Sequence, residues 1–179
     1  MITHYYMTDK KEKILQSALE LFAKSGVNAT STSKIAKLAG VSEGLIFRHF
    51  KSKKGLLNAL VESAEEKINI LFADIIKQDD AKVVIIKTID LPFLIKKSEY
   101  DYWKIQFKLK WEEEYNNPKK MQPLINKLSW AFSSLKYDYP ELEAQYLSQT
   151  LEAISTELLK GNLSNQNEFR AFLKYKYSV

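Results

Sequence analysis

The side chains with the most recognisable chemistry lie between Thr30 and Leu57, in the stretch TSTSKIAKLAGVSEGLIFRHFKSKKGLL. Hydroxyl, carboxylate, guanidinium and imidazole groups follow one another there, and three lysines come after them. Groups of these types contact phosphates and the polar edges of bases. A catalytic or metal-binding role for His49 is disfavoured, because the sequence offers it no nucleophile, acid partner or second ligand cluster.

Positive charge is confined to the N-terminal third of the 179-residue chain. Residues 1–55 contain ten lysine and arginine residues and four acidic residues, which gives a net charge of +6. The remaining 124 residues contain 17 basic and 18 acidic residues, a net charge of −1. This asymmetry indicates a polyanion-binding module attached to a second part, although a solvated basic face has the same charge totals.

The composition favours an all-helical protein, because the chain has only five glycines and four prolines and is rich in leucine, isoleucine, lysine, glutamate and alanine. No run of about 18 uncharged apolar residues is present, so we expect no membrane span. The absence of cysteine excludes disulfides and thiolate metal sites, and no cofactor is expected. A cytoplasmic protein is the simplest interpretation, and Met1 and Met7 both stay open as its natural start.

Apolar periodicity predicts about nine helices. In the first part we expect a helix over 9–25 with Asp9 as its N-cap, a short helix begun by Thr32 or Ser33, a second short helix after Ser42, and a long helix from Ser52 to about Ile76. The predicted ranges in the second part are 81–97 with a break near Pro92, 99–115, 119–137, 141–160 and 165–177. Residues 83–86 read locally as a strand, but a lone strand would have no partner.

Two short helices joined by a turn that contains glycine make a helix-turn-helix. The first helix needs a small residue where the two helices cross, which is Ala36. The turn needs a residue that tolerates positive φ, which is Gly40. Ile46 then packs the second helix against the first. The outward residues of the second helix are able to reach a DNA major groove; they are Ser42, Glu43, Gly44, Leu45, Phe47, Arg48 and His49.

The surrounding residues sharpen this interpretation. Residues 9–57 resemble the DNA-binding domain of the TetR family of bacterial transcriptional regulators, through the segments LFAKSG, IAKLAGVSEG and HFKSKKGLL in this order and spacing. The resemblance implies an N-terminal three-helix helix-turn-helix domain over 1–55, joined by a long helix to a helical ligand-binding and dimerisation domain over 56–179.

The resemblance also assigns roles to single residues. Thr32 and Ser33 would hold a phosphate at the start of the second helix, while Ser42, Glu43, Gly44 and Leu45 would face base edges. Phe47 would pack on a thymine methyl or a sugar, and Arg48 would read a guanine or hold a phosphate. His49 and Lys53 would contact the DNA backbone. Two departures from the family, Leu45 in place of threonine and Lys54 in place of glutamate, leave the operator sequence open. Phe50 is expected in the core.

In the second domain the resemblance implies a pocket for a small effector and a dimer interface. An apolar pocket wall would be formed by Phe93, Tyr100, Trp103, Phe107, Trp111 and Trp130, although an aromatic stripe at helical spacing is more often part of a packed core. The interface would use the last two helices, with Tyr146, Thr150, Leu151, Ile154 and Leu158 shared between the domain core and the partner. Leu142 is also expected to point inward.

We therefore expect a homodimeric regulator, a repressor, that binds a palindromic double-stranded DNA operator and is released by a small, largely apolar ligand. It is not expected to be an enzyme or to bind membranes. One alternative is a helical-domain enzyme or carrier for an apolar molecule with only non-specific DNA binding. Another is a helical scaffold whose basic N-terminus binds membranes, but this alternative does not explain the spacing of Ala36, Gly40 and Ile46.

Overall fold

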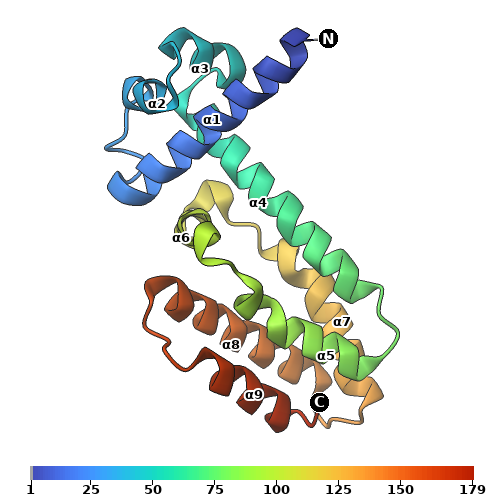
Figure 1. The fold of residues 1–179 in the computed structure, drawn as a ribbon. Helices are drawn as coiled ribbons and strands as arrows, with labels where there is room; N and C mark the ends of the chain where they lie inside the picture. The colour runs from blue at the N-terminus through green and yellow to red at the C-terminus, as the bar shows by residue number, and fades with distance from the viewer. Residues whose placement is uncertain (1) are drawn as a thin grey trace. The chain divides into compact units, whose positions relative to one another are not determined.

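The computed structural model describes the backbone of residues 2–179 and the side chains of residues 9–117 and 119–179. Over these residues the fold is all-α, as predicted, with nine α-helices, four short 3-10 helices and no strand. The α-helices are α1 Ile2–Ser25, α2 Thr32–Ala39, α3 Glu43–Phe50, α4 Lys53–Ile76, α5 Ala81–Asp90, α6 Tyr100–Leu109, α7 Gln122–Ser134, α8 Pro140–Lys160 and α9 Gln166–Lys176 (Figure 1). No helix within these ranges combines the length and the apolarity that crossing a membrane would require.

Backbone contacts divide the chain into two units. Unit 1 contains the residues up to Glu66 together with Asp101–Gln106, and unit 2 contains Lys67–Tyr100 and Phe107–Val179. Both α4 and α6 therefore contribute residues to each unit. The domain boundary at residue 55 stays a prediction.

Unit 1 is built from α1, α2, α3, the first half of α4 and residues Asp101–Gln106 of α6. Helix α2 contacts both α1 and α3 (Figure 1). Its core consists of apolar residues that recur at helical spacing. The fully buried side chains are Ile14, Ala18, Ile35, Ile46, Leu56 and Ala64. Phe50 is also buried, as predicted, at 6% exposure.

Two predicted helix starts in unit 1 are wrong. Helix α1 begins at Ile2, so Asp9 lies inside it and pairs with Lys13 one turn later at 2.8 Å instead of capping the helix. Helix α2 is capped by Ser31, one residue earlier than expected, because Ser31 has the extended backbone that an N-cap needs and its Oγ accepts the Lys34 N–H at 3.2 Å. Ser42 and Ser52 do precede α3 and α4 as predicted.

Two glycines allow consecutive helices of unit 1 to meet closely, Gly40 between α2 and α3 and Gly55 where α4 follows α3. Gly40 ends α2 with φ of +66°, and its N–H donates to the carbonyl oxygens of Ala36 and Lys37. Gly55 lies in the first turn of α4, where a Cβ would come within 1.9 Å of the Phe50 carbonyl oxygen. Any larger residue at position 55 would therefore push α4 away from the end of α3.

Unit 2 has its own core, made by the second half of α4 with α5, α7, α8 and α9. The largest fully buried side chains come from α4, α5, α7 and α8; they include Ile75, Ile85, Ile89, Leu124, Leu128, Phe132 and Leu147. Residues 83–86 are helical, and α5 ends at Asp90, after which Pro92 starts a 3-10 turn over Leu91–Leu94. The predicted break near Pro92 is therefore confirmed.

The predicted helix over 99–115 is wrong at its C-terminal end. Helix α6 stops at Leu109, and a separate 3-10 turn spans Glu113–Tyr115. Three consecutive glutamates at 112–114 oppose continuation, because negative charges repel one another and are unfavourable at a helix C-terminus. Trp111 consequently leaves the helical stripe on which it was predicted.

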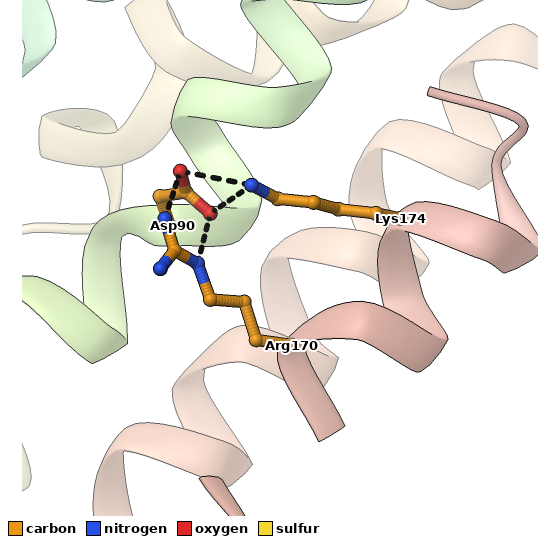
Figure 2. Close-up of polar contacts among 3 residues, drawn as sticks. All are labelled: Asp90, Arg170 and Lys174. Carbon is orange, nitrogen blue, oxygen red and sulfur yellow. Dashed lines mark hydrogen bonds and ion pairs between the residues drawn. The ribbon is translucent and has the colours of Figure 1, made fainter. Parts of the chain in front are cut away.

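A charged cluster fastens α9 to the end of α5 (Figure 2). The guanidinium of Arg170 donates two hydrogen bonds to Asp90, from Nε to Oδ1 at 2.7 Å and from Nη2 to Oδ2 at 2.6 Å. The Lys174 ammonium lies 2.9 Å from Oδ1 of the same carboxylate. Burial raises the pKa of Asp90, but the hydrogen bonds from Arg170 and Lys174 outweigh it and hold that pKa below its usual value.

Candidate nucleic-acid interface

The predicted helix-turn-helix is present in unit 1. Ala36 is buried at 4% exposure where α2 meets α3, and Ile46 is fully buried on the inner face of α3. The N–H of Val41 donates to the carbonyl oxygen of Ala36 at 3.0 Å, which closes the turn around Gly40. The predicted roles of Ala36, Gly40 and Ile46 in the helix-turn-helix are therefore confirmed.

Helix α3 presents an open face to solvent. Ser42, Glu43, Gly44 and Arg48 are exposed, and the Phe47 ring is 45% exposed. The Ser42 side chain makes no capping hydrogen bond, so its hydroxyl remains available to a ligand. Leu45 is half-buried, which makes it the most enclosed of the four residues predicted to face bases.

A groove of about 610 Å³ runs along this face of unit 1. Its walls carry three cationic side chains from three helices, Lys10 of α1, Lys37 of α2 and Arg48 of α3, and no acidic residue lines it. The remaining lining residues are small or apolar; they are Ala36, Gly40, Val41, Ser42, Gly44 and Leu45. A groove lined by cations and no acidic residue suits a phosphate chain.

Lys10 and Lys37 were not among the residues predicted to bind DNA. Both contribute to the basic charge of residues 1–55, so the charge count included them without placing them. Their position beside Arg48 depends on how α1 and α2 cross, which helical periodicity does not specify.

Thr32 and Glu43 are hydrogen-bonded to each other. The Thr32 hydroxyl donates to Oε1 of Glu43 at 2.5 Å, which joins the first turn of α2 to the first turn of α3. Ser33 is exposed beside them on α2. Of the two hydroxyls predicted to hold a phosphate, that of Thr32 thus donates to a carboxylate in this structure.

The Lys53 ammonium contacts the loop between α1 and α2. It donates to the carbonyl oxygens of Val27 at 2.9 Å, Asn28 at 3.4 Å and Thr30 at 3.0 Å. An ammonium group has three N–H donors, so these three carbonyls account for all of them. The role of Lys53 as a DNA-backbone contact stays a prediction, and the structure adds a second role in fixing the loop.

His49 is half-buried at the back of α3, with its ring centroid 6.0 Å from that of Phe50. Its Nε2 atom is buried and has no hydrogen-bond partner among the described residues. No group of three or more potential metal ligands occurs among those residues. His49 as a phosphate contact remains a prediction.

The six predicted pocket aromatics are in different surroundings. Trp103 is buried in unit 1 against Tyr102, whereas the other five belong to unit 2. Trp111 is 81% exposed and Trp130 is 40% exposed, each beside a lysine ammonium. Phe93 packs partly buried against the unit 2 core, and Tyr100 and Phe107 are half-buried.

The five predicted interface residues on α8 divide into two groups. Leu151, Ile154 and Leu158 are buried in the core of unit 2, whereas Tyr146 is 55% exposed and Thr150 is half-buried. Leu142 was predicted to point inward but is 61% exposed. On α9, Phe172 and Tyr175 are 57% and 85% exposed, and sequence reasoning had not singled them out.

The all-α fold of the described residues and the helix-turn-helix in unit 1 are features found in one class of DNA-binding proteins. Residues 14–60 match the family described as bacterial regulatory proteins of the tetR family. This match covers the helix-turn-helix region, over which the chain is similar to the TetR family.

Two relatives match the N-terminal region. The chain is 46% identical over 57 residues to the transcriptional regulator QacR of Staphylococcus aureus, which covers 32% of this chain and 30% of QacR. It is 43% identical over 63 residues to AcrR of Shigella flexneri, covering 35% of this chain and 29% of AcrR. The match thus spans about a third of these relatives' own length.

Solved structures match over most of the chain. NalD of Pseudomonas aeruginosa, the secondary repressor of a multidrug efflux pump, has a TM-score of 0.70 at 19% identity, covering 93% of this chain and 94% of NalD. A TerR/AcrR-family regulator of Aquifex aeolicus has a TM-score of 0.72 at 21% identity, covering 94% and 98%. At these identities the likeness establishes a shared fold.

Proposed function

We propose that this protein is a homodimeric transcriptional regulator that binds a palindromic DNA operator and acts as a repressor. The observation that carries the proposal is the open face of α3 beside a groove lined by Lys10, Lys37 and Arg48. Base edges would contact the start of α3, and the phosphate chain would lie along the groove. A single helix-turn-helix unit would bind too weakly to find one specific site in a genome, and a homodimer doubles these contacts.

Selection of a random duplex library on the full-length protein at moderate salt tests this function. We expect recovery of a palindrome with two half-sites about one helical turn apart. If a dimer neutralises about eight phosphates, the logarithm of affinity should fall with the logarithm of salt concentration at a slope near −7. Recovery of no preferred sequence, or a slope near zero, would reject the proposal.

We also propose that a small, largely apolar effector releases the protein from its operator, in the cytoplasm. The similarity of residues 14–60 to the TetR family and the aromatic content of unit 2 support this. Trp111 and Trp130 are exposed, so the pocket wall is proposed from the other four aromatics, Phe93, Tyr100, Trp103 and Phe107. A panel of flat aromatic and aliphatic compounds should be screened for release of the selected duplex, with tryptophan fluorescence as the binding signal. Release without a fluorescence change would argue against an aromatic-lined pocket.

A further inference from the structure

We infer that Glu43 is a sequence-reading residue that selects the exocyclic amino group of a base, foremost N4 of cytosine, and that Thr32 positions it. The inference rests on the proposed DNA-binding function and adds the base chemistry that one residue of the interface recognises. Glu43 places a carboxylate at the start of α3, hydrogen-bonded to Thr32, the residue predicted to hold a phosphate.

Glu43 is the single acidic residue between Ser31 and Gly55, a stretch that also contains six lysine and arginine residues. It is exposed and is the first residue of α3. The N-terminal residues of a recognition helix are those that contact base edges in the major groove. A negative charge at this point repels the DNA backbone, so a favourable contact requires a hydrogen-bond donor on the DNA.

The bond from Thr32 fixes where that carboxylate lies. Because the Thr32 hydroxyl donates to Oε1 of Glu43 at 2.5 Å, its hydrogen is already used and is not offered to a phosphate. The bond also restricts the rotamers of Glu43, which lowers the entropy lost when the carboxylate meets a base. Thr32 is therefore a positioning residue that acts through Glu43.

The acceptor-only chemistry of an ionised carboxylate limits which bases it is able to read. Guanine presents the acceptors N7 and O6 in the major groove and thymine presents O4, and all of these repel a carboxylate. Cytosine presents the N4 amino donor, and adenine pairs its N6 donor with the acceptor N7. Cytosine is therefore the base that Glu43 favours.

A simpler explanation is that Glu43 only stabilises α3, since an acidic residue in the first turn interacts favourably with the helix dipole. That role predicts a loss of stability on substitution and no change in base preference. Selection experiments with variants separate the two roles, because base preference does not depend on helix stability while the protein remains folded.

Random duplex selection should be repeated with E43Q, using E20Q as a control that makes the same charge change on the exposed face of α1. We expect the wild-type protein and E20Q to select cytosine at one position in each half-site. The E43Q protein should lose this preference by on the order of tenfold and shift towards adenine, because a glutamine amide pairs with both N6 and N7 of adenine. All other positions should be unchanged.

The positioning role of Thr32 is tested with T32V and T32S. We expect T32V to keep cytosine as the preferred base with discrimination reduced several-fold, and T32S to restore it because serine keeps the donor. The salt dependence should remain that of the wild type. A shallower salt slope in T32V with full discrimination would show that Thr32 contacts a phosphate and would overturn this role.

Failure of the inference is distinguishable from failure of the proposed function. If the wild-type protein selects a palindrome and E43Q selects the same one with equal discrimination, Glu43 does not read a base and the proposed function still stands. If the wild-type protein selects no sequence, the proposed function is rejected and the role of Glu43 is rejected with it.

Discussion

Gly44 is an exposed glycine in the first turn of α3, and a Cβ added there would meet nothing within 4 Å. Packing therefore gives no reason for a glycine at this position. Close approach of α3 to base edges does give one, because a methyl group would separate the two surfaces.

We predict that G44A leaves the protein as stable as the wild type or more stable by about 0.5–1 kcal/mol, since alanine favours helix over glycine. Affinity for the selected duplex should fall about tenfold, the equivalent of about 1.4 kcal/mol. Thermal unfolding and duplex titration measure the two effects separately.

The control is G55A, which should lose stability because its Cβ would lie 1.9 Å from the Phe50 carbonyl oxygen. Wild-type affinity in G44A would place position 44 away from the DNA.

For Lys53, two roles make different predictions. If its main role is to hold the loop between α1 and α2, K53A should lower the free energy of unfolding by about 1–3 kcal/mol, because three carbonyls lose a charged donor. Amide hydrogen exchange should then accelerate over residues 27–31, while the salt dependence of DNA binding stays unchanged.

If Lys53 instead contacts a phosphate, K53A should make the salt slope of a dimer shallower by about 2. The exposed Lys24 on α1 provides the control variant K24A, which should change neither the exchange nor the slope. Unchanged exchange over residues 27–31 would show that the loop does not depend on Lys53.

Among the elements, α9 is joined to α5 by a charged cluster in addition to the apolar core that they share. Asp90 is 16% exposed, and Arg170 and Lys174 both bond to it. We predict that D90N lowers the free energy of unfolding by about 1–3 kcal/mol at neutral pH, because two partly buried cations lose their counter-charge. The control is D74N, which breaks an exposed pair with Lys87 and should cost a few tenths of a kcal/mol.

The same cluster makes this difference depend on pH. Because the pKa of Asp90 is lowered in the folded state, its stabilisation is present above the unfolded pKa of about 3.9 and is lost as pH falls through the folded value. Denaturant titrations of the wild type and D90N should therefore differ most above about pH 5 and converge in acid. A difference that persists at pH 2 would mean that the ion pairs are not its source.

At the scale of the whole molecule, unit 2 leaves large apolar side chains exposed on its last two helices. They are Leu142 and Tyr146 on α8 and Phe172 and Tyr175 on α9, each more than half exposed. The Lys176 ammonium lies 5.9 Å from the centre of the Tyr146 ring, which places the end of α9 next to α8. Exposed apolar groups gathered in this way fit the interface proposed for the homodimer.

We predict that F172E weakens dimerisation by at least about tenfold, because it would replace an exposed aromatic side chain of the proposed interface with a charge. Sedimentation equilibrium measures the association directly, and the unfolding midpoint of the wild type should rise with protein concentration while that of F172E should not. The control is L94E, since Leu94 is 58% exposed in the turn after α5. Dissociation by L94E and not by F172E would place the interface elsewhere.

Much of unit 1 was predictable from local sequence. The spacing of Ala36, Gly40 and Ile46 specifies how two short helices cross, because each position has a steric requirement that few residues meet. The structure confirms all three, along with Phe50 in the core. The predicted helix boundaries were less accurate, as at the start of α1 and the end of α6. The end of a helix depends on capping and charge interactions that each contribute only a few tenths of a kcal/mol to its stability.

The sequence by itself determined the all-α fold, the helix-turn-helix and the basic character of the first 55 residues, since all of these follow from periodicity, turn chemistry and charge along the chain. Only the tertiary structure decided that Thr32 bonds to Glu43, that Lys53 holds a loop 23 to 26 residues away, and that Leu142 faces solvent. Helical spacing tells which residues share a face, but not which face a neighbouring helix covers or which distant group meets a side chain.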